Sequence, residues 1–230
     1  MEKLKDKRLT NRIVLFVLAL FVVSLGVSLT TRANLGTSPA ACPPYVLSLA
    51  PQLPLTMGTY MFAMQVMFVL AQIALLRSRF EKLQLFQFVA SFLFGLYTDI
   101  TMWLTTPFIY ENYAMQWVVL LIGCSVMAFG IALELKAALL LLPGEGLVKA
   151  ISQVGGWKFP NVKIWNDVVM TMVGSLLSVA LIGSFEGVRE GTVVSALLTG
   201  FMVKVFMPYC SGLDRWVKPQ IGMLATNYKE

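Results

Sequence analysis

Ser24-Leu25-Gly26-Val27-Ser28-Leu29 decides the fold, because Ala128-Phe129-Gly130-Ile131-Ala132-Leu133 repeats its pattern later in the chain. The central glycines, Gly26 and Gly130, are 104 positions apart (130 − 26). The same shift also pairs other residues: Pro39 with Pro143, Ala33 with Ala137, and Ser48 with Ser152. Because the matching residues fall in the same order, we predict that the second half of the chain repeats the first.

The composition places the chain in a membrane. Of its 230 residues, 57% are hydrophobic and 13% are charged, whereas a soluble domain carries about a quarter charged residues. The net charge of +6 does not indicate nucleic acid, because the basic residues lie at the ends of apolar stretches, where they report orientation. No polar stretch is long enough to fold separately, so we expect one compact membrane domain.

Six apolar stretches approach the length of about 20 residues that a membrane-spanning helix needs. We predict spans at 13–31, 57–76, 83–106, 115–135, 162–183 and 192–209. The first is longer than the core of a secretory signal and precedes no good cleavage site, so we expect it to remain as a helix. The predicted protein is all-α, with a basic N-terminus at 1–12, three-helix repeats at 13–106 and 115–209, and a tail at 210–230.

The positions of lysine and arginine predict the direction of these spans. With the N-terminus inside, all of the 18 basic residues except Arg32, Arg189 and Lys204 fall on the cytoplasmic side. Basic residues are enriched in cytoplasmic loops, so we expect both termini in the cytoplasm. Because each half has three spans, the second half would run in the opposite sense, giving the 3+3 inverted-topology repeat that recurs in carriers.

Each half also contains a segment in which glycine and proline interrupt the apolar sequence. These segments are Asn34-Leu35-Gly36-Thr37-Ser38-Pro39 and Leu142-Pro143-Gly144-Glu145-Gly146. We expect each to form an unwound elbow followed by a re-entrant helix too short to span. Unwound backbone is tolerated at membrane depth only where protein or water surrounds it. The elbows therefore either face each other around a polar ligand in the middle of the membrane, or lie flat on opposite surfaces.

The first of these interpretations predicts the binding residues, because the free N–H groups at a helix N-terminus attract anions. We assign substrate binding to both elbows and to the start of the last span: Gly36, Thr37, Ser38, Pro39, Pro143, Gly144, Glu145, Gly146, Gly191 and Thr192. The segment Arg189-Glu190-Gly191-Thr192 would line an entrance from outside. Glu145 lies between two glycines and is the candidate for coupling to a proton or cation, with helix capping as the alternative.

Ionisable residues inside spans are costly and are candidates for function. Asp99 and Lys204 each stand four positions after a glycine, Gly95 and Gly200. We predict that they form an ion pair between the halves, which either gates a carrier or only joins the halves.

Two further acidic residues lie near the ends of spans. Asp167 either points into the cavity, as a coupling group, or caps the start of the fifth span. Glu134 stands two residues before Lys136, and we expect its side chain to extend to the membrane interface.

The residue types that are absent exclude several chemistries. The chain has no histidine, which excludes a Ser-His-Asp triad and most zinc sites. Cys42, Cys124 and Cys210 lack the spacing of metal ligands, and we expect them to be unpaired. No phosphate-binding Gly-x-x-x-x-Gly-Lys-Ser/Thr loop is present. We therefore predict no enzymatic activity, no metal and no cofactor.

The segments 33–39, 143–147 and 189–197 together resemble the YczE/YitT-like group of bacterial integral membrane proteins. The resemblance extends over about 13–209, and the order of the three motifs carries it. It implies a multi-pass protein of the bacterial inner membrane, and it implies neither a substrate nor catalytic residues.

These observations lead us to expect a small secondary carrier of a polar or anionic small molecule, working by alternating access with proton or cation coupling. Two alternatives remain open: a non-transporting membrane partner, such as a regulator or assembly factor, and a passive channel. The expected partners are the lipid bilayer and a small-molecule or ion substrate, without nucleic acid, and the sequence is compatible with a homo-oligomer.

Overall fold

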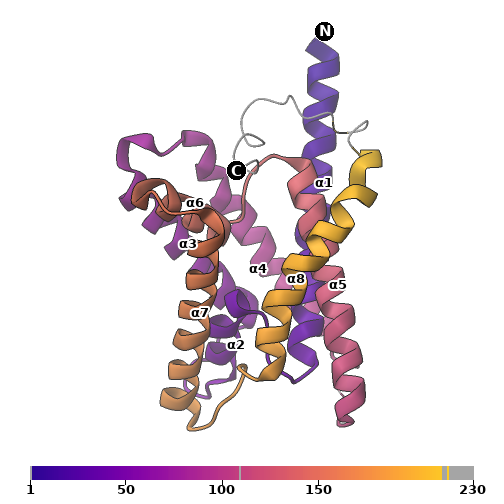
Figure 1. The fold of residues 1–230 in the computed structure, drawn as a ribbon, viewed down its shortest axis with the longest axis vertical. Coiled ribbons are helices and arrows are strands. Elements are labelled where there is room, and N and C mark those ends of the chain that lie inside the picture. The colour runs from indigo at the N-terminus through magenta and orange to yellow at the C-terminus, as the bar shows by residue number, and fades with distance from the viewer. Residues whose placement is uncertain (1, 109, 214–216, 218–230) are drawn as a thin grey trace.

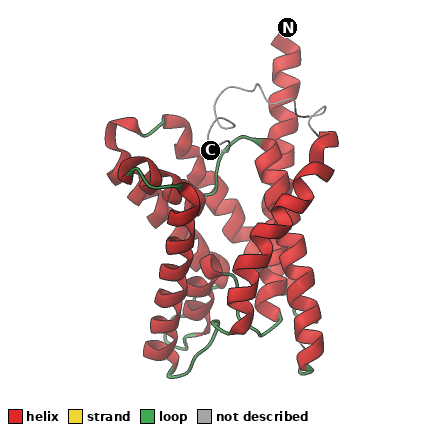
Figure 2. Ribbon diagram, in the orientation of Figure 1, coloured by secondary structure: helices red, strands yellow, loops and turns green. Residues whose placement is uncertain are grey.

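The computed structural model describes residues 2–108, 110–213 and 217, and this part of the chain consists of helices joined by loops (Figure 1). Eight α-helices follow one another: α1 (Glu2–Arg32), α2 (Cys42–Leu49), α3 (Met57–Leu76), α4 (Gln87–Leu104), α5 (Tyr113–Ala137), α6 (Pro143–Gly155), α7 (Phe159–Ile182) and α8 (Glu190–Tyr209). Single 3-10 turns adjoin them: η1 (Pro39–Ala41), η2 (Arg77–Arg79), η3 (Lys82–Phe86) and η4 (Cys210–Leu213). Within the described residues no strand is present (Figure 2), so the all-α prediction is confirmed.

Six of these helices are long and apolar enough to cross a membrane, which makes the chain a multi-pass membrane protein. Helices α5, α7 and α8 begin two or three residues before the predicted spans. At α5 the reason is a cap: the side chain of Asn112 accepts a hydrogen bond from Ala114 N at 2.9 Å. Polar caps belong to a helix but do not add to its hydropathy, so a count of apolar residues begins too late.

The central contact of the bundle is between α1 and α5. The repeated glycines allow their backbones to approach: a Cβ at Gly26 would lie 2.5 Å from Met127 Cα, and a Cβ at Gly130 would lie 2.6 Å from Val23 N. Small residues bring helices together in membranes, where burial of apolar surface gives no driving force. The glycine pattern that opens the sequence thus forms the interface between the two halves.

The other helices pack around this pair. Helix α4 packs on α1 and α8 packs on α5, while each short helix lies against a long helix of the other half, α2 on α7 and α6 on α3 (Figure 1). The halves differ in how their last two helices pack. Helix α3 packs along α4, whereas α7 and α8 do not pack along each other.

The bundle has two distinguishable ends. At the first, which we call the basic end, α1, α4 and α7 begin and α3, α5 and α8 finish; it carries Arg12, Arg77, Arg79, Lys136, Lys149, Lys158 and Lys163. At the opposite end, the far end, α1 finishes at Arg32 and α8 begins after Arg189. Residues 2–12, predicted as a separate segment, continue α1. Most of the predicted tail at 210–230 lies outside the described residues, as do Arg215, Lys218 and Lys229.

We expect Gly26→Val to destabilise the protein, because a side chain at position 26 has no room beside Met127. Overpacking of this kind costs about 1–3 kcal/mol, which thermal unfolding of the purified protein in detergent would register as a lower Tm. Gly200→Ala in α8 is the matched control, since nothing lies within 4 Å of the added Cβ. An unchanged Tm for Gly26→Val would contradict the close packing of α1 on α5.

Candidate functional site

The two elbows lie at opposite ends of the bundle. The first follows α1 at the far end, where the guanidinium of Arg32 donates to the carbonyl of Met102 at 2.7 Å. The second lies at the basic end, where Gln72 Nε2 donates to Pro143 O at 3.0 Å and to Gln87 Oε1 at 3.2 Å. Met102 and Gln87 are about 22 Å apart along α4 at 1.5 Å per residue.

The prediction that the elbows share a ligand in the middle of the membrane is therefore wrong. The physical reason is the antiparallel packing of α1 and α5. Each elbow follows one of these full-length helices, so the elbows emerge where the two helices finish, at opposite ends.

The first elbow is closed by the segment that begins α8. Three hydrogen bonds join them: Gly191 N to Leu35 O at 2.7 Å, Thr37 N to Gly187 O at 3.0 Å, and Arg189 Nη1 to Asn34 O at 2.8 Å. Gly36 has a φ of +97° and lies against the Thr192 side chain, so a side chain at this position would be both strained and crowded. Thr37, Ser38 and Thr192 are buried. Six predicted binding residues thus form a packed junction: Gly36, Thr37, Ser38, Pro39, Gly191 and Thr192.

The second elbow gathers polar side chains from four helices. We call this cluster the elbow site: Gln72 of α3, Gln87 of α4, Glu134 of α5 and Glu145 of α6. Gln72, Gln87 and Glu134 are each at most 2% exposed. Gly146 fits closely against the two amides, since a Cβ there would lie 2.6 Å from Gln72 Oε1 and 3.0 Å from Gln87 Nε2. The other predicted residues of this elbow, Pro143 and Gly144, lie beside Gln72 and Phe68.

Glu134 is the member of the elbow site whose position differs from the prediction. The prediction that its side chain extends to the interface is wrong, because Glu134 is 2% exposed. Its Oε1 accepts a hydrogen bond from Leu142 N at 3.1 Å, and its Oε2 has no hydrogen-bond partner in the described part of the chain. The cause is Ala138, whose φ of 48° reverses the chain after α5 and brings Leu142 back over the carboxyl group.

A buried carboxylate with an unpartnered oxygen is unfavourable unless a proton or cation neutralises it. A sequence signal for Glu134 existed: an acidic residue in the last turn of an apolar helix, directly before a Gly/Pro elbow. It was overlooked because the nearby lysine suggested an interfacial position.

Glu145 lies in the first turn of α6, outside the six spans. Burial raises the pKa of the Glu145 carboxyl, Lys163 lowers it in part, and Asp167 raises it. Glu134 lies close enough to Glu145 for the two carboxylates to repel each other when both are ionised, so a proton on Glu145 relieves this repulsion. The elbow site is therefore suited to binding a proton.

Asp167 does not cap a helix, so that prediction is wrong. Helix α7 begins at Phe159, two turns before Asp167. The Asp167 carboxylate instead pairs with Lys163 of the same helix at 2.9 Å. Both remain charged neighbours of Glu145.

The predicted ion pair between Asp99 and Lys204 does not form. Asp99 Oδ1 accepts from Gly58 N at 2.8 Å and Oδ2 accepts from Thr56 Oγ1 at 2.7 Å, so Asp99 binds the N-terminal turn of α3. Lys204 is exposed, near the last turn of α8. Because α4 and α8 run in opposite directions, residues near their last turns lie at opposite ends of the bundle.

A row of buried polar side chains along α4 was also missed. Its members recur every three, four or seven residues and are at most 2% exposed: Gln87, Ser91, Thr98, Thr101 and Thr105. The Thr101 hydroxyl bonds Ser24 and Ser28 of α1 at 2.8 and 2.7 Å. The row runs from the elbow site to the far end, and its helical spacing was visible in the sequence.

Comparisons with known proteins find a family model and a relative, neither of them with an assigned activity. A family model described as a family of unknown function (DUF6198) matches residues 10–208. The uncharacterized protein YyaS of Bacillus subtilis (strain 168) is 25% identical over 193 residues, which cover 83% of this chain and 90% of YyaS. No solved structure matches the chain. The resemblance to the YczE/YitT-like group stays a prediction, because neither match names that group.

We expect Asp99→Ala to lower the Tm, because it leaves the Gly58 N–H in the first turn of α3 and the Thr56 hydroxyl without their acceptor. Loss of such a cap costs about 0.5–2 kcal/mol. Asp167→Ala is the control, since it removes only a partly exposed ion pair within one helix, which is worth about 0.3–0.5 kcal/mol. Equal Tm values for the two variants, measured by thermal unfolding in detergent, would contradict the capping role of Asp99.

We expect Glu145 to make stability depend on pH. A carboxyl whose folded pKa is raised favours the folded state most below its ordinary pKa of about 4.3, and this contribution is lost as the pH rises through the folded pKa. The Tm of the wild type should therefore fall relative to that of Glu145→Gln as the pH increases. Glu111→Gln, at an exposed position, should follow the wild type. Parallel curves for the wild type and Glu145→Gln would show that the carboxyl is not buried.

Proposed function

The chain belongs to this family of unknown function, and we propose from its geometry that it is a small secondary carrier. It would move a polar or anionic small molecule across the bacterial inner membrane by alternating access, with proton coupling at the elbow site. The basic end would face the cytoplasm, since basic residues gather there.

The observation that carries the proposal is the unpartnered Oε2 of Glu134 beside the second carboxyl of Glu145. Glu134 belongs to a helix apolar enough to span a membrane, where a buried acid is by default a functional group. A proton on this pair removes one charge and supplies a donor. Deprotonation restores the repulsion between α5 and α6, so the charge state biases how α6 packs.

The packing pattern supports an inverted repeat. Helices α1–α4 and α5–α8 follow the same order of one long helix, one short helix and two long helices. The short helix of each half packs on the third helix of the other, α2 on α7 and α6 on α3. Two halves of inverted topology exchange their short elements in this manner around a pseudo-twofold axis.

The difference in packing between the pair α3–α4 and the pair α7–α8 supports alternating access. Helices α3 and α4 are held together at Gly58 and Gly95, where a Cβ on Gly95 would lie 2.6 Å from Gly58 O. Gly200 follows the same pattern in α8, but nothing lies within 4 Å of a Cβ built there. In a carrier with exchangeable halves, one such pair is closed while the other is open. The second state would close α8 on α7 and separate α4 from α3.

One end of the polar row on α4 would then be released to the solute. Gln87 is hydrogen-bonded to Gln72 of α3, whereas Thr101 is hydrogen-bonded to Ser24 and Ser28 of α1. When α4 separates from α3, the Gln87 amide would therefore offer hydrogen bonds to a polar molecule, while Thr101 would stay on α1.

The proposal is tested by transport in proteoliposomes with an imposed pH gradient. Radiolabelled amino acids, small carboxylates and phosphate esters serve as candidate solutes. We expect the gradient to drive uptake of one of these classes by the wild type, and Glu134→Gln to reduce this uptake about 5- to 150-fold, the range produced by coupling free energies of 1–3 kcal/mol.

Exchange of labelled for unlabelled solute without a gradient should persist in Glu134→Gln, because exchange needs no net proton movement. Glu111→Gln, an exposed glutamate, is the matched control and should behave as the wild type. Failure of the wild type to move any solute, or gradient-driven uptake by Glu134→Gln equal to that of the wild type, would falsify the proposal.

A further inference from the structure

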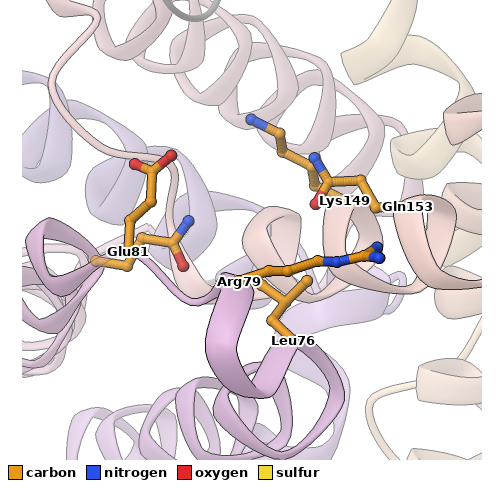
Figure 3. Close-up of a pocket in the computed structure, with 6 residues that line it drawn as sticks. Leu76, Arg79, Glu81, Lys149 and Gln153 are labelled. Atoms are coloured by element: carbon orange, nitrogen blue, oxygen red, sulfur yellow. The ribbon is translucent and has the colours of Figure 1, made fainter.

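A pocket of about 430 Å³ opens at the basic end of the bundle (Figure 3). Its lining comes from the connection between α3 and α4 and from α6: Leu76, Arg79, Glu81, Gln84, Lys149 and Gln153. Leu76 stands one helical turn after Gln72 on α3, and Lys149 stands one turn after Glu145 on α6. Because residues four positions apart share a helix face, the pocket lies one turn beyond the elbow site on the same two helices.

The walls of the pocket carry charges of both signs. Figure 3 shows the carboxylate of Glu81 on one side and the guanidinium of Arg79 on the other, with the ammonium of Lys149 between them in the view. In the described part of the chain, no ion pair or hydrogen bond occupies these three side chains. Charged groups that face one pocket without neutralising each other are available to a ligand.

The neutral lining residues add polarity and direction. The side-chain oxygen of Gln84 is buried and has no hydrogen-bond partner in the described residues. This acceptor stands three positions after Glu81 on the connection to α4, so the acidic wall accepts hydrogen bonds while the wall of Arg79 and Lys149 donates them. Leu76 is the one apolar residue among the six that line the pocket, which disfavours an apolar ligand.

We propose that this pocket binds a small zwitterion, a molecule with an ammonium group and a carboxylate or phosphate a few bonds apart. The ammonium would donate to Glu81 and Gln84, and the anionic group would accept from Arg79 and Lys149. A lone anion is repelled by Glu81 and a lone cation is repelled by the basic wall, so the pocket selects molecules that carry both charges. Its volume is within the 300–1,000 Å³ of small-molecule sites.

The inference deepens the proposed function in one respect, by naming the class of solute, and it rests on that function only there. Binding itself does not require transport. Two sources share the required chemistry: a free zwitterion, such as an amino acid, and the phosphoethanolamine headgroup of a lipid. The position of the pocket at the end of spanning helices leaves both within reach.

Calorimetric titration of the purified full-length protein in detergent tests the proposal. The probes are glycine and O-phosphoethanolamine, with acetate, inorganic phosphate and ethylamine as probes of single charge. We expect both zwitterions to bind at least about tenfold more tightly than the single ions, as loss of a charge-assisted hydrogen bond predicts. Equal affinity for inorganic phosphate and O-phosphoethanolamine would reduce the pocket to an anion site and overturn the proposal, as would absence of zwitterion binding.

Single substitutions test the contributions of the basic and acidic residues to binding separately. Arg79→Gln and Lys149→Gln should each weaken zwitterion binding, whereas Glu81→Gln should weaken it and at the same time improve binding of inorganic phosphate. Arg77→Gln, a neighbouring basic residue that does not line the pocket, is the control and should bind as the wild type. If Glu81→Gln loses binding of zwitterions and of phosphate alike, with an unchanged Tm, the assignment of the ammonium to Glu81 and of the anionic group to Arg79 and Lys149 is wrong.

A second arm distinguishes the two sources. In nanodiscs containing phosphatidylethanolamine, glycine should be displaced if the lipid headgroup is the occupant. In nanodiscs of phosphatidylcholine, whose quaternary ammonium has no N–H to donate, it should not be displaced. If zwitterions bind but no solute is transported, the pocket proposal holds and the carrier proposal is wrong. If a solute is transported but no zwitterion binds, the carrier proposal holds and the pocket proposal is wrong.

Discussion

The close contact of α1 with α5 determines where everything else lies. Gly26 against Met127 and Gly130 against Val23 allow two full-length helices to run antiparallel with their backbones touching. Helices in a membrane gain nothing from hiding apolar surface from each other, so backbone approach is the source of such an interface. Since these two helices finish at opposite ends, the short helices that follow them also begin at opposite ends, α2 beside α7 and α6 beside α3.

The elbow site follows from how α5 finishes. Arg12 of α1 donates to the carbonyls of Ala137 and Ala138, which satisfies acceptors that a helix leaves open at its C-terminus. Ala138 then takes the left-handed conformation and returns the chain across the carboxyl of Glu134. The turn supplies one hydrogen bond to that carboxyl and excludes water from its other oxygen. The buried acid is thus a product of helix termination, and α6 brings the second acid to it.

The sequence predicted the parts that depend on local pattern. Apolar length located six spans, whereas the matched glycines were interpreted as the mark of a repeat and their contact between the halves was not predicted. The sequence did not predict which polar groups meet, because that depends on the direction of each helix. Asp99 and Lys204 occupy matching positions in their halves, but antiparallel helices carry matching positions to opposite ends. Glu134 is buried because the backbone of Ala138 takes the left-handed conformation. This conformation is uncommon for alanine and cannot be predicted from the sequence.

The elbow site and the pocket both include residues of α3 and α6. Glu145 and Lys149 stand one turn apart on α6, and Gln72 and Leu76 stand one turn apart on α3. In the proposed carrier, a change in the packing of α6 that accompanies a proton on Glu134 or Glu145 would therefore also move Lys149 relative to Arg79 and Glu81. Coupling between two ligands needs only that each prefers a different arrangement of a shared element, and it is reciprocal. A zwitterion held between α6 and the α3–α4 connection would then change the free energy of proton binding at the elbow site. The proton would change the free energy of zwitterion binding by the same amount.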